Sequence, residues 1–183
     1  MDFLEIKGKV IREIDSTLDK VEKVDELVEE IISANKVFVV GSGRSELMLE
    51  AFAKRLGHLG LDVHVVGETI QPPASKGNLL IVASGSGKSV FPLSIAKKAK
   101  EIGMKVALIT ARKDSEISRI SDLTVYIPAS IKLDSPTEKL SFQPLSNLFE
   151  QCLLILCDIT AILIQKKKGL KDNDLLKYHT NLE

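Results

Sequence analysis

Two short segments of the sequence combine glycine with serine in a way that suits the binding of an anion. The first is Gly41-Ser42-Gly43-Arg44-Ser45, and the second is Ser84-Gly85-Ser86-Gly87-Lys88-Ser89. Glycine lets backbone N–H groups approach a phosphate closely, and serine adds hydroxyl donors. Each segment follows an apolar, strand-like run and precedes a helical pattern, so the free amides of that helix would point at the bound group. The two segments therefore predict a site for a phosphorylated small molecule.

Two other phosphate-binding patterns fit these segments less well. A dinucleotide-binding G-x-G-x-x-G would need its third glycine where Glu46 stands. A P-loop would match Gly87-Lys88-Ser89 at its end, but its first glycine would fall at Val82, inside the preceding strand-like run. A third interpretation, in which these are ordinary turn residues that join strand to helix, stays open.

Glu150 is the candidate for acid–base chemistry. It stands near the start of an otherwise apolar helical pattern, Leu148 to Gln165, where a charge needs a reason. One carboxylate placed over a sugar can remove a proton beside a carbonyl and return it to the neighbouring carbon. The alternative is that Glu150 only complements the positive end of the helix dipole. The residues alone leave both interpretations open.

The histidines are the other candidates for proton transfer, and their spacing indicates no metal site. Histidine as a residue type suits proton movement between substrate oxygens, which makes His179 in the C-terminal tail a candidate, although a surface imidazole is the alternative. His58 would end the helix that begins at Ser45, about 20 Å from that phosphate loop. We expect it to act structurally or in an adjacent chain. Arg44 and Glu68 stay open between ligand binding and pairing with a nearby charge.

These residues need a scaffold that brings the ends of several strands together. Five apolar, largely β-branched runs are typical of parallel strands that are covered on both faces: 36–41, 62–68, 79–84, 106–111 and 123–128. Helical patterns lie between them at 45–59, 90–102 and roughly 114–121. This alternation predicts an α/β fold with an open, doubly wound, five-stranded parallel sheet flanked by helices. Ligands of such sheets bind beyond the carboxyl ends of the strands, where both glycine-serine loops fall.

The two ends of the chain are also predicted to be helical. Helical spacing covers Val10 to Ser33 with a break near residues 22–25, within a leading helical segment 1–34. A last short helix is expected around Asp172 to Tyr178, within the polar tail 166–183. The apolar run 148–165 approaches the ~20 residues of a membrane span, but polar residues interrupt it. We expect it to be buried against the sheet and at a subunit interface.

The composition is typical of one soluble globular domain, residues 1–183. Hydrophobic residues make up 44% of the chain, and 25 basic residues balance 25 acidic ones. That balance argues against nucleic-acid binding by bulk electrostatics and against a basic membrane anchor. The N-terminus lacks the pattern of a signal peptide. Cys152 and Cys157 share one apolar run, which predicts buried thiols in a reducing cytoplasm.

The two loops and the αβ order resemble the sugar isomerase (SIS) domain family. Longer segments narrow the resemblance to the 6-phospho-3-hexuloisomerase family: Arg55-Leu-Gly-His58-Leu-Gly60, Gly67-Glu-Thr69, Gln143-Pro-Leu-Ser-Asn-Leu-Phe-Glu150-Gln151 and His179-Thr-Asn-Leu-Glu183. The sequence departs from that family at Glu46 and Ser146, where glycine is common, and at Ile70 and Gln71, where threonines are common. These departures bear on substrate preference more than on reaction type.

The resemblance implies an SIS-type sheet, similar to flavodoxin-like and Rossmann-like folds, and an isomerase without metal or organic cofactor. Its implied reaction interconverts D-arabino-hex-3-ulose 6-phosphate and D-fructose 6-phosphate, in formaldehyde assimilation by the ribulose monophosphate pathway or in pentose supply. Glu150 would be the acid–base residue, and Ser45 with the loop Ser84 to Ser89 would bind the phosphate.

The resemblance also implies a homotetramer, assembled as a dimer of dimers, in which the tail with His179 reaches a neighbouring subunit's site. Two alternatives remain: another SIS isomerase acting on a pentose or heptose phosphate, or a non-catalytic sugar-phosphate-binding SIS module.

Overall fold

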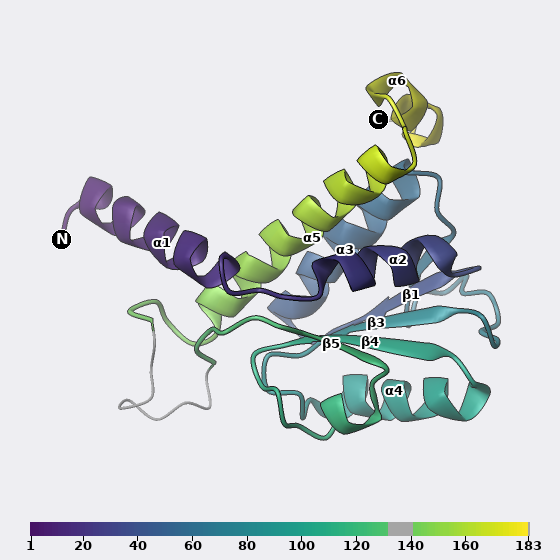
Figure 1. Cartoon of the computed structure of the whole chain (residues 1–183), viewed down its shortest axis with the longest axis horizontal. Coiled ribbons are helices and arrows are strands. Elements are labelled where there is room, and N and C mark those ends of the chain that lie inside the picture. Colours follow the sequence, from purple (N-terminus) through teal and green to yellow (C-terminus); the bar gives the residue numbers. More distant parts are fainter. Residues whose placement is uncertain (132–140, 183) are drawn as a thin grey trace.

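A parallel sheet of five strands forms the centre of the molecule (Figure 1). The computed structural model of the chain describes residues 1–131 and 141–182. The strands are β1 (Val37–Val40), β2 (Val63–Val65), β3 (Leu79–Ala83), β4 (Lys105–Thr110) and β5 (Leu123–Tyr126), and their order across the sheet is β2-β1-β3-β4-β5. All neighbouring strands run parallel. The predicted five-stranded parallel sheet is confirmed.

Helices precede, separate and follow the strands. They are α1 (Phe3–Leu18), α2 (Val24–Ser33), α3 (Arg44–His58), α4 (Val90–Ile102), α5 (Asn147–Lys167) and α6 (Asp172–Leu175), with short 3₁₀ turns η1 (Ser118–Ile120) and η2 (Leu176–Tyr178). The helix α1 begins earlier than the predicted start at Val10 because Asp2 and Glu5 form a capping box. The Asp2 carboxylate accepts the Glu5 N–H at 2.9 Å, and the Glu5 carboxylate accepts the Asp2 N–H at 3.0 Å.

The helix predicted at 114–121 is wrong, because only the 3₁₀ turn η1 forms there. Two serines explain the difference. The Ser115 N–H donates to the Ser118 hydroxyl at 2.7 Å, and the Ser118 N–H donates to the Ser115 hydroxyl at 3.2 Å. Serine side chains that bond nearby backbone groups compete with helix formation and favour turns.

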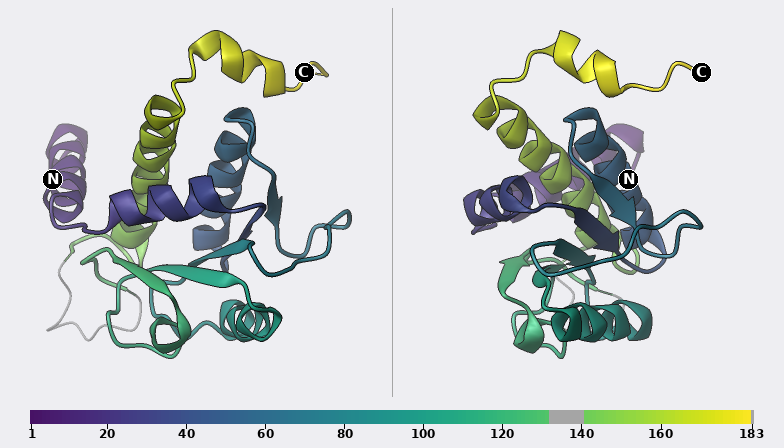
Figure 2. Two further views of the ribbon diagram at one scale, coloured as in Figure 1. Left: turned by 45° about the vertical axis from the view of Figure 1, so that its right-hand side comes forward. Right: turned by 90° about the vertical axis from the view of Figure 1, so that its right-hand side faces the viewer.

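The two faces of the sheet are covered by different helices (Figures 1 and 2). Along β1, Val37 and Val39 pack in the larger hydrophobic cluster, which contains residues of α2, α3 and α5. Phe38 and Val40 point the other way, into a smaller cluster with residues of α4. Side chains of a strand alternate between faces, so an all-apolar strand needs cover on both sides. The doubly wound arrangement is therefore as predicted.

The helix α5 is long and apolar enough to cross a membrane, but it packs in the core. Its buried residues are Leu148, Phe149, Cys152, Leu153, Leu156, Cys157, Thr160, Ala161 and Ile164. It packs against α1, α2 and α3, and most extensively against α3. This helix is therefore a core helix of the α/β fold, in agreement with the expected burial.

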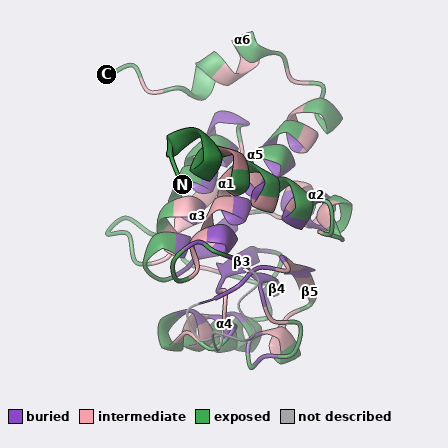
Figure 3. Cartoon of the chain, turned by 90° about the vertical axis from the view of Figure 1, so that its left-hand side faces the viewer, coloured by how far each residue is buried: buried purple, intermediate pink, exposed green. Residues whose placement is uncertain are grey.

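The N-terminal part of the first helix projects from the molecule. In Figures 1 and 2 the N-terminal part of α1 projects beyond the body formed by the sheet and its covering helices. Large apolar side chains on α1 are exposed, including Phe3 (77%), Leu4 (64%) and Ile11 (60%), and most of this helix has the green colour of exposed residues in Figure 3. The C-terminal α6 and η2 lie at the opposite end of the molecule (Figure 1).

Candidate active site

The two glycine-serine loops lie side by side at the carboxyl edge of the sheet. They follow β1 and β3, which are neighbouring strands with Val40 paired to Val82. The helix α3 begins at Arg44, which places the buried Ser45 in its first turn. The helix α4 begins at Val90, directly after Ser89. The expected position of both loops, between a strand end and a helix start, is confirmed.

The second loop is held in shape by its own hydroxyl and amide groups. The buried Ser84 hydroxyl accepts the Gly87 N–H at 3.1 Å and lies 3.0 Å from the Ser89 hydroxyl. Gly87 has a φ of +63°, and a Cβ atom there would lie 2.1 Å from the Ser115 Oγ. Only glycine fits this position without moving the Ser115 turn. Lys88 is exposed and Ser86 and Ser89 are half-buried, so these side chains are nearer to solvent than Ser84.

Glu150 lies in the first turn of α5 and forms an ion pair with Arg44, at the start of α3. The Arg44 Nε donates to Glu150 Oε2, and the Arg44 Nη2 donates to Asn147 Oδ1 at 2.9 Å. The Glu150 side chain is 13% exposed, whereas the Arg44 side chain is 58% exposed. The sequence left the partner of Arg44 open, and no motif spacing identifies a carboxylate more than 100 residues away.

The start of α5 also lies against the second loop. A Cβ atom on Gly85 would lie 3.3 Å from the ring of Phe149 and 3.0 Å from Ile131. Since Phe149 is the residue before Glu150, the second glycine-serine loop and the Glu150 carboxylate lie at the same edge of the molecule. The structure therefore brings together the Arg44–Glu150 pair and both glycine-serine loops. An anion-binding cradle beside a carboxylate of fixed orientation can hold a phosphorylated substrate and transfer a proton within it.

His179 lies elsewhere in the same chain. Its ring stacks on the ring of His58, with centroids 5.0 Å apart. His58 is the last residue of α3, and Arg44 is the first. A helix of this length spans roughly 20 Å, so the structure does not bring His179 to the Glu150 of its own chain. That the C-terminal tail extends into a neighbouring subunit's site stays a prediction.

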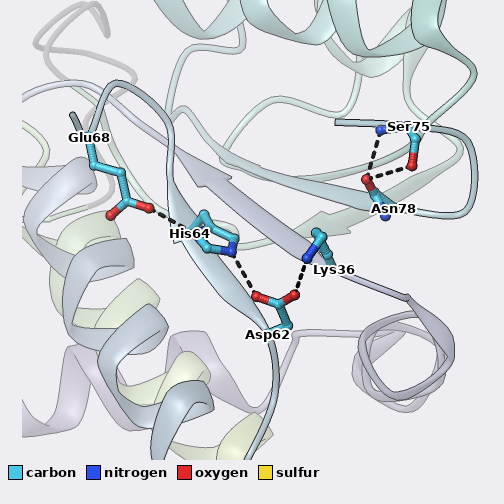
Figure 4. Close-up of polar contacts among 6 residues, drawn as sticks. All are labelled: Lys36, Asp62, His64, Glu68, Ser75 and Asn78. Atoms are coloured by element: carbon cyan, nitrogen blue, oxygen red, sulfur yellow. Dashed lines mark hydrogen bonds and ion pairs between the residues drawn. The ribbon is translucent and has the colours of Figure 1, made fainter. Parts of the chain in front are cut away.

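Glu68 belongs to a separate polar cluster beside the edge strand β2 (Figure 4). His64 Nδ1 lies 2.9 Å from Glu68 Oε1, and His64 Nε2 lies 2.7 Å from Asp62 Oδ1. Lys36 in turn pairs with Asp62. The hydrogen bond from Lys36 lowers the pKa of the Asp62 carboxyl, burial opposes this change, and the hydrogen bond with His64 lowers the pKa further. In the structure Glu68 therefore pairs with a nearby side chain, His64.

The two cysteines are buried thiols, as predicted. Burial raises the pKa of Cys152 to about 12, although a hydrogen bond with Thr17 opposes the rise and the Glu13 carboxylate adds to it. Burial also raises the pKa of Cys157 strongly. Within residues 1–131 and 141–182, no three His, Cys, Asp or Glu side chains gather in a way that could hold a metal ion.

Comparisons with known proteins give the family of the chain. The sequence matches the family model of the SIS domain over residues 30–156. It is 39% identical to a 3-hexulose-6-phosphate isomerase of Bacillus subtilis over 88% of each chain. It is 38% identical to a 3-hexulose-6-phosphate isomerase of Mycobacterium gastri, with 93% of this chain and 86% of that protein covered.

A solved structure supports the same relationship. A crystal structure from Methanococcus jannaschii, for which a molecular function of 3-hexulose-6-phosphate isomerase was inferred, is 32% identical. It superimposes with a TM-score of 0.85 over 98% of this chain and 99% of that one. Since the family model spans more than half of the sequence and the relatives match nearly all of it, this chain belongs to the SIS domain family.

Proposed function

We propose that this chain is a 3-hexulose-6-phosphate isomerase, which interconverts D-arabino-hex-3-ulose 6-phosphate and D-fructose 6-phosphate. The observation that carries the proposal is the ion pair of Glu150 and Arg44 beside two loops suited to phosphate. Relatives at 38–39% identity that bear this name support the choice of substrate. The proposed enzyme acts as one domain in the cytoplasm, in formaldehyde assimilation by the ribulose monophosphate pathway.

The substrate's phosphate binds at the two loops in this proposal. Ser45 lies in the first turn of α3, and Ser86, Lys88 and Ser89 carry the more accessible side chains of the second loop. Gly85 and Gly87 let the backbone approach the phosphate, and Ser84 keeps the loop folded through its contacts with Gly87 and Ser89. The helix starts of α3 and α4 add partial positive charge.

Glu150 performs the proton transfer between carbons. It removes the proton from carbon 2 of the 3-ulose, and the electrons of that C–H bond form the enediolate as the carbon 3 carbonyl opens. Glu150 then returns the proton to carbon 3, while the carbonyl forms at carbon 2. The Arg44 guanidinium orients Glu150 and stands beside the negative charge that develops on the sugar oxygens.

The second proton in the reaction moves between the two sugar oxygens, and we assign this step to His179 of a neighbouring subunit. In its own chain His179 lies with His58 at the far end of α3, so the step requires an assembly. The proposed assembly is a homotetramer built as a dimer of dimers. Exposed apolar side chains on α1, such as Phe3 and Leu4, are available for contact between copies of the chain.

The first experiment compares the wild type with Glu150→Gln and with Asp158→Asn, which removes an exposed carboxylate from the same helix. Conversion of the hexulose phosphate is followed with and without a chelator, and ligand binding is measured by calorimetry. Loss of the general base lowers kcat by about 10²–10⁴-fold, with binding of fructose 6-phosphate retained. Asp158→Asn keeps the wild-type rate, and the chelator has no effect.

Undiminished turnover by Glu150→Gln would remove Glu150 from the mechanism. If the wild type prefers a pentose or heptose phosphate in a side-by-side panel, the chain is a different SIS isomerase. If it binds sugar phosphates and converts none of them, it is a non-catalytic binding module.

A further inference from the structure

A carboxylate on the projecting helix α1 is hydrogen-bonded to the segment that leads into α5. Glu13 Oε2 accepts from the Ser141 hydroxyl at 2.7 Å and from Gln143 Nε2 at 2.9 Å, and Glu13 Oε1 accepts from the Phe142 N–H at 3.1 Å. Ser141 and Gln143 are buried, with exposed fractions of 6% and 3%. These three hydrogen bonds join the segment that precedes α5 to a helix more than 120 residues away in sequence.

The hydrogen bonds continue from this point to the candidate acid–base residue. Gln143 Oε1 accepts from Asn147 Nδ2 at 2.7 Å, and Asn147 Oδ1 accepts from Arg44 Nη2 at 2.9 Å. Arg44 Nε then donates to Glu150. A continuous series of bonds thus connects Glu13 on α1, through two amide side chains, to the Arg44–Glu150 ion pair.

The two charged ends force the amides between them into one orientation. A guanidinium can only donate, so Asn147 must present its oxygen to Arg44 and its NH₂ group to Gln143. Gln143 must then present its oxygen to Asn147 and its NH₂ group to Glu13. An ionised carboxylate can only accept, so Glu13 selects this orientation and rejects the flipped one. Directional series of this kind are strengthened where little water is present.

We propose that Glu13 is a positioning residue, which acts through Gln143, Asn147 and Arg44 to fix the orientation of Glu150. The proposal rests on the proposed function and goes beyond it, because residue 13 lies outside the segment 30–156 matched by the family model. It assigns the projecting helix α1 a role inside the site of its own chain. A neutral glutamine at position 13 has one acceptor oxygen in place of two, so it cannot accept from both the Phe142 N–H and the Gln143 NH₂ group. Gln143, Asn147 and Arg44 would then be held from the Arg44 end alone.

The first test needs no substrate. The Arg44 Nε–H resonance of the full-length, ¹⁵N-labelled protein is assigned by its loss in Arg44→Lys and is then compared between wild type and Glu13→Gln. The proposal expects this resonance to shift or broaden in Glu13→Gln. The matched control is Asp15→Asn, which removes an exposed carboxylate from the same helix and should leave the resonance unchanged. An unchanged resonance in folded Glu13→Gln overturns the proposal.

The second test is kinetic and separates positioning from binding. Misorientation of Glu150 should lower kcat in Glu13→Gln about tenfold, while KM stays within about twofold of wild type. Glu13→Asp, which keeps an acceptor-only carboxylate, should recover part of the loss. Gln143→Met should lower kcat similarly, and the double variant should lose no more than the worse single one, since both act on one series of bonds. Additive losses, or a wild-type kcat in Glu13→Gln, contradict the proposal.

Thermal unfolding of each variant shows whether it is folded. If Glu13→Gln fails to fold, both tests are made on Gln143→Met, because this variant breaks the series of hydrogen bonds without altering α1. If Gln143→Met then has the same Arg44 resonance and the same kcat as the wild type, the proposal is overturned. A wild type that converts no hexulose phosphate refutes the proposed function alone. The Arg44 resonance then still decides whether Glu13 positions the pair.

Discussion

Arg44 fixes the position of Glu150, the residue proposed as the acid–base group. The guanidinium group is planar and donates in fixed directions, so its two bonds to Glu150 and Asn147 hold both partners at once. Glu150 is thereby fixed in orientation, with only 13% of its side chain exposed. A carboxylate in this setting differs from one that merely caps a helix dipole, which would need no partner. This arrangement is the one on which the proposed acid–base role of Glu150 rests.

The buried thiols give a prediction at the same scale. Cys152 and Cys157 should not react with a thiol reagent at pH 8 in the native protein, and two thiols per chain should react after unfolding in guanidinium. Since burial raises the pKa of Cys152 to about 12, the folded state keeps the neutral thiol. In the unfolded state the Cys152 thiol ionises at about pH 8.5. The contribution of this thiol to the free energy of unfolding is therefore fully present below that pH.

That stability is lost as pH rises from about 8.5 toward the folded pKa of Cys152. Unfolding by denaturant at a series of alkaline pH values measures this loss. Rapid labelling of the native protein at pH 8 would show that the helix α5 opens far more often than its burial indicates.

At the scale of elements, the shape of the loop 84–89 depends on Gly87. Gly87→Ala adds a Cβ atom at a position with positive φ and directs it at Ser115. Positive φ alone costs alanine about 1–2 kcal/mol, and the overlap adds about 1–3 kcal/mol more. Thermal unfolding and calorimetric binding of fructose 6-phosphate measure the effects, and both stability and affinity should fall.

Gly169→Ala is the matched control for this loop variant. Gly169 also has positive φ, at +64°, but an added Cβ atom would meet nothing within 4 Å. Its loss of stability should be only the backbone part, about 1–2 kcal/mol, with no change in binding. Equal losses in the two variants would mean that the contact with Ser115 is unimportant for the loop.

The helix α3 sets the distance between two groups of candidate residues. Arg44 stands at its start and His58 at its end, with His179 stacked on His58. An α-helix is rigid and rises about 1.5 Å per residue, so these ends cannot approach each other in one chain. If both Glu150 and His179 act on one substrate, they must come from different copies of the chain.

For the whole molecule, the exposed apolar face of α1 leads to a prediction about assembly. Phe3→Glu combined with Leu4→Glu should yield smaller particles in light scattering, because each large apolar side chain contributes about 1.5–3 kcal/mol when fully buried in an interface. Lys7→Glu, which alters the charge of the same exposed helix without removing apolar surface, should keep the wild-type particle size. A wild type that is a stable monomer would contradict the proposed shared site.

Local patterns were sufficient to predict the strands, most of the helices and the position of both loops. The period of the apolar residues and the position of glycines are local features, which a short stretch of sequence contains. Buried parallel strands such as Val37–Val40 and Leu79–Ala83 are recognised because they are continuously apolar. The segment 114–121 was predicted as a helix because its spacing is helical, whereas Ser115 and Ser118 bond each other's backbone and form a turn.

Contacts between distant residues could not be predicted in this way. The pairing of Arg44 with Glu150, the bonds from Glu13 to Gln143, and the separation of His179 from Glu150 all depend on how α1, α3 and α5 pack. Each of these residues is polar, and no local pattern identifies its partner, which lies far along the chain. Its role is set by which donors and acceptors the folded backbone brings within hydrogen-bonding distance, and a one-dimensional pattern does not contain that information.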